Sequence, residues 1–169
     1  MRRKRKVDYK TTEKGFEEFT IGSLTTPLHK SISVTLKPKT VYSTSKKTMV
    51  YHLEGNRFEY LGGEWNNGRI RFDTHELGQF TLLTDSVSPG VSRIYCNSRT
   101  ARFRISDNLS GISSYSATIN GEWLLMKYDY KTGILHSERS SKKVLLKGDF
   151  ELTVTDRAGN EKIYKQKIL

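Results

Sequence analysis

The feature that most constrains this 169-residue chain is the alternation of apolar and polar side chains in several short runs. In one of them Phe150, Leu152 and Val154 are separated by Glu151 and Thr153. Successive side chains of a β-strand point to opposite faces, so such a run buries one face and exposes the other. Similar runs cover residues 32–36, 103–105, 115–119 and 124–128. No stretch of ten or more residues keeps a helical spacing, and the sequence therefore predicts an all-β protein.

Turn-forming residues separate these runs. The strongest signal is Asn120-Gly121, which lies between two alternating runs and predicts a two-residue type I′ hairpin turn. Further turn signals are Gly62-Gly63, Asn66-Asn67-Gly68, Pro89-Gly90, Lys131-Thr132-Gly133 and Ala158-Gly159-Asn160. Short strands with regular turn signals are typical of antiparallel sandwiches. We therefore predict two small antiparallel β-sandwich modules, Ig- or fibronectin-like, in tandem.

A junction between the two modules is predicted at Asp85–Gly90. Residues 79–84 are typical of a closing strand and residues 91–94 of an opening one. Pro89 cannot donate to a sheet ladder and fits a junction better than a central strand. The predicted organisation is a basic, flexible N-terminal segment over residues 1–15, a first β-module over residues 16–86 and a C-terminal Ig-like sandwich over residues 90–169.

The alternation also predicts which side chains share a core in the second module. Apolar side chains on the same face of their strands should form one buried cluster, because a register shift of one residue would move a whole run to the solvent-exposed face. The predicted members are Phe103, Ile105, Leu124, Met126, Leu152 and Val154.

Charge and cysteine content limit the classes of protein to which the chain can belong. Lys and Arg number 29 against 18 Asp and Glu, a formal charge of +11, and five of the basic residues lie in Met1–Lys6. This tail is interpreted as a solvated segment, with a nucleic-acid-binding arm as the alternative. No apolar run follows it as in a signal peptide, and none approaches the ~18–20 residues of a membrane-spanning helix. A single cysteine, Cys96, excludes an internal disulfide and a zinc site made of cysteines alone.

Residues that could carry out chemistry are scattered. None of the four histidines lies two or four residues from another; they are His29, His52, His75 and His136. We therefore predict no catalytic, cofactor-binding or metal-binding residue. A stand-alone zinc hydrolase whose site is assembled from these distant histidines remains an alternative, as does a basic nucleic-acid-binding protein.

Two further features have both a structural and a functional interpretation. Asp107-Asn108, and Asp156 with Asn160, lie where loops are expected; backbone capping is the first interpretation and a calcium site the alternative. Trp65 and Trp123 each follow a Gly-Glu pair. They are either packing residues or a sugar-stacking surface, and they are the candidate binding residues of this chain.

Three segments of the second module, Phe103–Tyr115 (FRISDNLSGISSY), Ala117–Asp129 (ATINGEWLLMKYD) and Phe150–Asn160 (FELTVTDRAGN), carry a family resemblance. They resemble the C-terminal Ig-like module of lysostaphin-type zinc peptidoglycan endopeptidases from Gram-negative bacteria. The first module resembles the one that precedes it there, with matching pieces at Thr26–Lys30, Ser33–Pro38, Leu61–Trp65 and Gly78–Phe80.

The resemblance implies a cellular location and a function for the chain. In that family an aspartate, a histidine and a His-x-His pair upstream of these modules hold the zinc; no His-x-His occurs here, so no catalytic residue is carried over. It implies a non-catalytic accessory region in the periplasm or at the outer-membrane surface, which positions or recruits a partner at the cell wall. That partner would be the family's catalytic domain, another envelope protein or peptidoglycan. Zinc is expected only in such a catalytic domain, and we predict no enzyme activity for this chain by itself.

Overall fold

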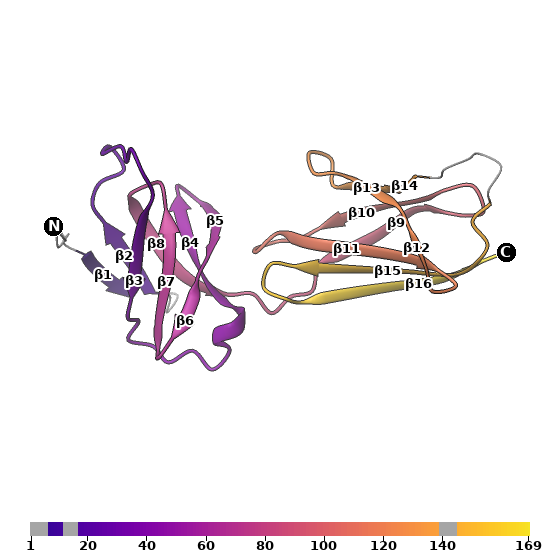
Figure 1. Cartoon of the computed structure of the whole chain (residues 1–169). Coiled ribbons are helices and arrows are strands. Elements are labelled where there is room, and N and C mark those ends of the chain that lie inside the picture. The colour runs from indigo at the N-terminus through magenta and orange to yellow at the C-terminus, as the bar shows by residue number, and fades with distance from the viewer. Residues whose placement is uncertain (1–6, 12–16, 139–144) are drawn as a thin grey trace. The chain divides into compact units, whose positions relative to one another are not determined.

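The computed structural model describes residues 7–11, 17–138 and 145–169, and divides the chain into two compact units, Met1–Asp85 and Ser86–Leu169. Strands account for most of the described residues and all sheet pairings between them are antiparallel (Figure 1). The prediction of an all-β fold built from antiparallel sandwiches is confirmed. Within the described ranges, no helix is long and apolar enough to cross a membrane.

The first unit packs a five-stranded sheet, in the order β1-β2-β8-β4-β5, against a three-stranded sheet, β3-β7-β6. A short 3₁₀ turn, η1, precedes β4. The elements are β1 (Val7–Thr11), β2 (Glu17–Ile21), β3 (Ile32–Leu36), η1 (Ser45–Lys47), β4 (Thr48–Glu54), β5 (Arg57–Gly62), β6 (Glu64–Asn66), β7 (Arg69–Thr74) and β8 (Gly78–Thr84).

The second unit is a sandwich of two four-stranded sheets, in the orders β13-β14-β10-β9 and β12-β11-β15-β16 (Figure 1). Its strands are β9 (Gly90–Cys96), β10 (Ala101–Ser106), β11 (Ile112–Ile119), β12 (Glu122–Leu124), β13 (Met126–Asp129), β14 (Ile134–Ser137), β15 (Gly148–Asp156) and β16 (Glu161–Ile168).

The predicted core of the second unit is confirmed. Phe103, Ile105, Met126, Leu152 and Val154 are buried in one cluster, and Leu124 packs against it while partly exposed. The cluster joins the two sheets: the ring of Phe103 on β10 stacks on that of Phe150 on β15, with 5.5 Å between centroids.

The hairpin between β11 and β12 has the predicted geometry. Asn120 and Gly121 are its two loop residues, and their φ angles of 51° and 82° are both positive, as a type I′ turn requires. The alternating run 124–128 does not form a single strand. The chain passes from one sheet to the other at Leu125. Leu124 therefore ends β12 and Met126 begins β13, and both still face the shared core.

The N-terminal segment differs in part from the predicted flexible tail. Residues 7–11 form β1, which pairs with β2 over its whole length. Tyr9 explains the pairing. Its ring packs edge-on against that of Phe19, with 5.5 Å between the ring centroids, and its hydroxyl donates a hydrogen bond to Glu17. The rest of that prediction, for residues 1–6 and 12–15, lies outside the described residues.

Truncation of Leu152 tests the register of β15. Leu152 is fully buried at the centre of the second core, so Leu152→Ala should lower the free energy of unfolding by about 2–5 kcal/mol through lost burial and a residual cavity. Urea denaturation of the two proteins measures the difference. Leu145→Ala is the matched control, because Leu145 is exposed and its truncation should change stability by under ~0.5 kcal/mol. A similarly small loss for Leu152→Ala would contradict the register.

Candidate functional site

The two tryptophans singled out by the sequence have different surroundings. Trp65 lies on β6 opposite the buried Ile70 and packs against the core of the first unit. Its indole Nε1 donates to the carbonyl oxygen of Thr48 at 2.7 Å, and its ring lies 5.9 Å from that of Tyr42. Trp65 is also one of the residues that line a surface hollow of about 570 Å³. Trp65 therefore serves mainly to fix β6 against the first core.

Trp123, in contrast, is 68% exposed. It lies on the edge strand β12, directly opposite Thr118 of β11. Thr118 is opposite Glu151 of β15, which in turn is opposite Lys165 of β16. Directly opposed side chains of a sheet point to the same face, so these four residues form one row across the outer face of the sheet. We call Trp123, Thr118, Glu151 and Lys165 the Trp123 row.

A hollow of about 840 Å³ lies on this face beside the Trp123 row. Six of its lining residues are Thr118, Asn120, Asp149, Glu151, Lys165 and Lys167. Asn120 and Gly121 of the hairpin line the hollow, as does Thr118, the residue of β11 that lies opposite Trp123. The hairpin is held in place, because the side-chain oxygen of Asn120 accepts a hydrogen bond from the Asp149 amide at 2.9 Å.

The charges of this face compensate one another. Lys165 Nζ lies 2.7 Å from Glu151 Oε2, and Asp149 and Lys167 are opposite in the register of β15 and β16. The next row of the sheet, Ser116, Thr153 and Ile163, adds two hydroxyls and one exposed apolar side chain. The outer face thus combines one large aromatic surface with hydroxyl groups, one ion pair and one carboxylate that lies opposite a lysine in the register.

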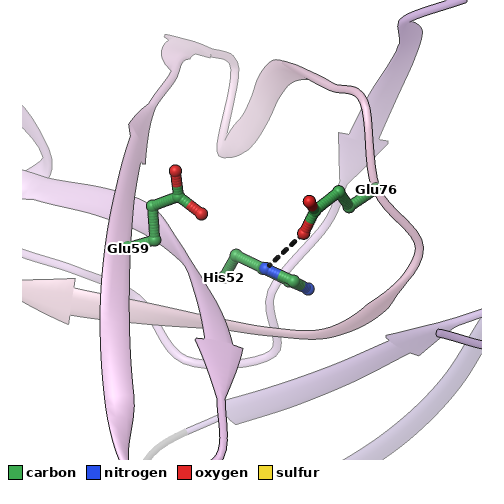
Figure 2. A group of neighbouring side chains, drawn as sticks. All are labelled: His52, Glu59 and Glu76. Atoms are coloured by element: carbon green, nitrogen blue, oxygen red, sulfur yellow. Dashed lines mark ion pairs between the residues drawn. The ribbon is translucent and has the colours of Figure 1, made fainter.

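In the described part of the first unit, one group of side chains has its metal-ligating atoms close together. One ligand atom each from His52, Glu59 and Glu76 lie within 4.8 Å of one another. His52 and Glu59 are opposite in the register of β4 and β5, and Glu76 comes from the loop between β7 and β8 (Figure 2). Thr74 fixes that loop, since its hydroxyl donates to the Glu76 carbonyl and accepts from the Glu76 amide.

The geometry of His52 favours a contact with the Glu76 carboxylate over a metal site. Its Nδ1 faces Glu76 Oε2 at 3.4 Å (Figure 2). The centroid of the buried His52 ring lies 5.0 Å from that of Phe80. A metal-ligating histidine usually donates its other ring nitrogen to a carboxylate or carbonyl. His52 Nε2 is buried without a hydrogen-bond partner in the described part of the chain. The three residues could hold a divalent cation, but the supporting contact on the far side of the ring is missing.

The other predicted candidates lie apart from this group. His29 and His75 are exposed in loops of the first unit, and His136 is partly buried on β14 of the second. The group around His52 therefore contains one histidine with two glutamates, and no group of metal-ligating atoms in the described ranges brings the four histidines together. Cys96 packs against the second core, and burial raises the pKa of its thiol, partly offset by Arg93. A thiol with a raised pKa is a weak nucleophile at neutral pH.

The loop carboxylates act as caps, as predicted. Asp107 Oδ2 accepts from the backbone amides of Leu109 and Gly111, at 3.0 and 2.7 Å. The carboxylate of Asp156 accepts from both the backbone amide and the side-chain amide of Asn160, each at 2.8 Å. These contacts close the loops after β10 and β15. The calcium alternative for these loops stays a prediction.

Sequence reasoning missed the most buried carboxylate of the first unit, Glu17. Its Oε1 accepts hydrogen bonds from the Tyr9 hydroxyl, the Lys39 amide and the Thr40 amide, each at 2.8 Å, and from the Thr40 hydroxyl at 3.1 Å. Glu17 therefore ties β1 and the loop after β3 to the start of β2. Its neighbour Tyr42 has its pKa raised to about 12 by burial, with the negative charge of Glu17 and the proximity of Tyr9 adding to the effect.

Comparisons with known proteins bear mainly on the first unit. Residues 5–85 match the family model of the Zu5-like domain, which is slightly less than half of the chain. No curated protein matches the chain. Among solved structures, the apo form of the expansin from Clavibacter michiganensis aligns with a TM-score of 0.35 at 13% identity, over 76% of this chain and 71% of that one. So weak a structural likeness supports no inference about this chain.

The raised pKa of Tyr42 predicts a pH dependence of stability. An unfolded tyrosine loses its proton near pH 10, whereas folded Tyr42 keeps its proton until about pH 12. Between these values the unfolded state binds fewer protons, so the contribution of Tyr42 to stability is complete below pH 10 and falls as the pH rises towards 12. Urea denaturation at several pH values should show a shallower decline for Tyr42→Phe than for the wild type. Tyr130→Phe, at a 76% exposed position, should leave the decline unchanged; equal slopes in all three proteins would contradict the assignment.

Proposed function

We propose that the chain is a non-catalytic accessory region of a cell-envelope peptidoglycan endopeptidase, which positions or recruits a partner at the cell wall. It would work in the periplasm or at the outer-membrane surface. The observation that carries the proposal is the Trp123 row, an exposed indole on a sheet face whose opposite side is a closed core. A rigid sandwich that exposes a large aromatic side chain on an outer face is suited to binding.

The roles of the other candidate residues support a binding function. Asp107 and Asp156, which lie in the segments that resemble the endopeptidase modules, cap loops of the sandwich. Cys96 packs against the core, and a raised pKa keeps its thiol protonated. In the second unit these groups stabilise a scaffold, and the sheet faces are left to contact a partner.

A second candidate function rests on the group of His52, Glu59 and Glu76. A zinc hydrolase holds its ion with three protein ligands and keeps one position for water, and this group offers three ligand atoms within 4.8 Å. The contact between His52 Nδ1 and the Glu76 carboxylate, and an Nε2 with no hydrogen-bond partner among the described residues, favour the binding function over this one.

Digestion and sedimentation of purified cell-wall sacculi test the proposal in one experiment. The intact chain is mixed with sacculi in the presence of zinc; the pellet reports binding and the supernatant reports released muropeptides. We expect the chain to sediment with the sacculi and to release no muropeptides above a buffer control. An exposed-loop variant, His29→Ala, serves as the matched control for substitution of a histidine.

The opposite result is equally specific. Release of muropeptides that a chelator abolishes, and that His52→Ala or Glu59→Gln removes while His29→Ala does not, would make the chain a hydrolase. A chain that neither sediments with sacculi nor releases muropeptides would contradict the role at the cell wall.

A further inference from the structure

The side chains on the outer face of the sheet β12-β11-β15-β16 limit the classes of ligand that this face can bind. Trp123 is 68% exposed at one end of the Trp123 row, and the other three residues of the row line a hollow of about 840 Å³. An indole buries a large apolar area when a flat partner covers it. The partner must therefore bring an apolar surface of about the size of one ring to the edge of the sheet.

The charges next to Trp123 argue against a charged ligand. Glu151 and Lys165 form an ion pair at 2.7 Å, and Asp149 and Lys167 are opposite in register. A polyanion would meet at least as many carboxylates as ammonium groups along these strands. An uncharged ligand with many hydroxyls can instead hydrogen-bond to Thr118, to the rim of the ion pair and to the hydroxyls of Ser116 and Thr153.

The distribution of apolar side chains argues against a large protein interface. Stable protein interfaces bury about 800 Å² on each partner around a desolvated apolar centre. On this face Trp123 lies on β12 and the exposed Ile163 lies on β16, with β11 and β15 between them. The side chains between them are hydroxyls and paired charges. The face therefore offers one aromatic ring, that of Trp123, at the edge of the sheet and polar groups across the neighbouring strands. This arrangement suits a linear polymer of sugar rings, which has both apolar ring faces and hydroxyl groups.

From these features we infer that the second unit binds an uncharged polysaccharide strand on this face. One pyranose ring stacks on Trp123, and the following sugars lie across Thr118 and the hollow towards Lys165. The inference rests on the proposed function in that the chain acts by binding, and it names the ligand class as a chain of uncharged sugar rings and not the peptides of the wall. No bond is made or broken in this step.

Binding of uncharged oligosaccharides to the intact chain tests the inference. The probes are the β-1,4-linked hexamers of N-acetylglucosamine and of glucose, followed by calorimetry. Trp123→Ala should weaken binding of the better hexamer by about tenfold or more, since the stacking surface is lost. Trp123→Phe should recover most of the affinity. Tyr130→Ala, which removes an aromatic ring that is 76% exposed outside this sheet, should change the affinity by less than about twofold.

Salt dependence separates this ligand from a polyanion. Affinity for the hexamers should change by less than about twofold between 50 and 500 mM salt, whereas binding that depends on phosphates falls steeply over this range. Single-stranded oligothymidylate is the polyanion probe. Tighter, salt-sensitive binding of that probe, lost in Trp123→Ala, would overturn the inference in favour of nucleic acid.

Two further outcomes separate this inference from the proposed function. If the wild type and Trp123→Ala sediment equally with sacculi and bind the hexamers equally, the function stands and the glycan face is wrong. If neither hexamer binds and Trp123→Ala abolishes self-association in ultracentrifugation, the face joins two copies of the chain and the inference is overturned. Circular dichroism of each variant confirms that the fold is intact.

Discussion

The register of β15 determines which side chains of the second unit meet the core and which meet the solvent. This nine-residue strand pairs with β11 on one side and β16 on the other, and it alternates buried and partly exposed residues from Phe150 to Asp156. A slip by one residue would bring Glu151 and Thr153 into the core and expose Leu152. The Trp123 row contains Glu151, so the composition of the outer face depends on the same register as the core.

Contacts at both ends of β15 hold that register. At its start Asn120 lies so close to Gly148 that a side chain there would collide with it, and Gly148 has a φ of 123°, which favours glycine. At its end Asp156 accepts two hydrogen bonds from Asn160. These local polar contacts explain why turn residues matter as much as apolar ones in positioning the face.

Local sequence patterns predicted much of the fold but only part of the candidate site. Alternation identified the core around Leu152, because the period of a strand is visible in five residues. Trp65 and Trp123 share the same Gly-Glu-Trp context, yet one packs on a core and the other faces solvent. The difference comes from the strands with which each pairs, and pairing partners are distant in sequence.

The groups that the sequence did not predict are assembled by contacts over longer distances. Glu17 accepts hydrogen bonds from Lys39 and Thr40, more than twenty residues away, and a carboxylate at a strand start carries no local sign of such burial. His52 meets Glu76 only because β4 pairs with β8, beside the loop that carries the glutamate. In the first unit, therefore, the buried polar contacts had to be observed in the structure.

Binding at the outer face of the second unit is the central claim, and an NMR titration tests it most directly. The β-1,4-linked hexamer of N-acetylglucosamine is added to the ¹⁵N-labelled intact chain. The account predicts that the largest shift changes fall on the Trp123 indole Nε1–H and on the amides of Thr118, Glu151 and Lys165, with the amides around His52 unchanged. Changes concentrated around His52, Glu59 and Glu76, or spread evenly over both units, would contradict it.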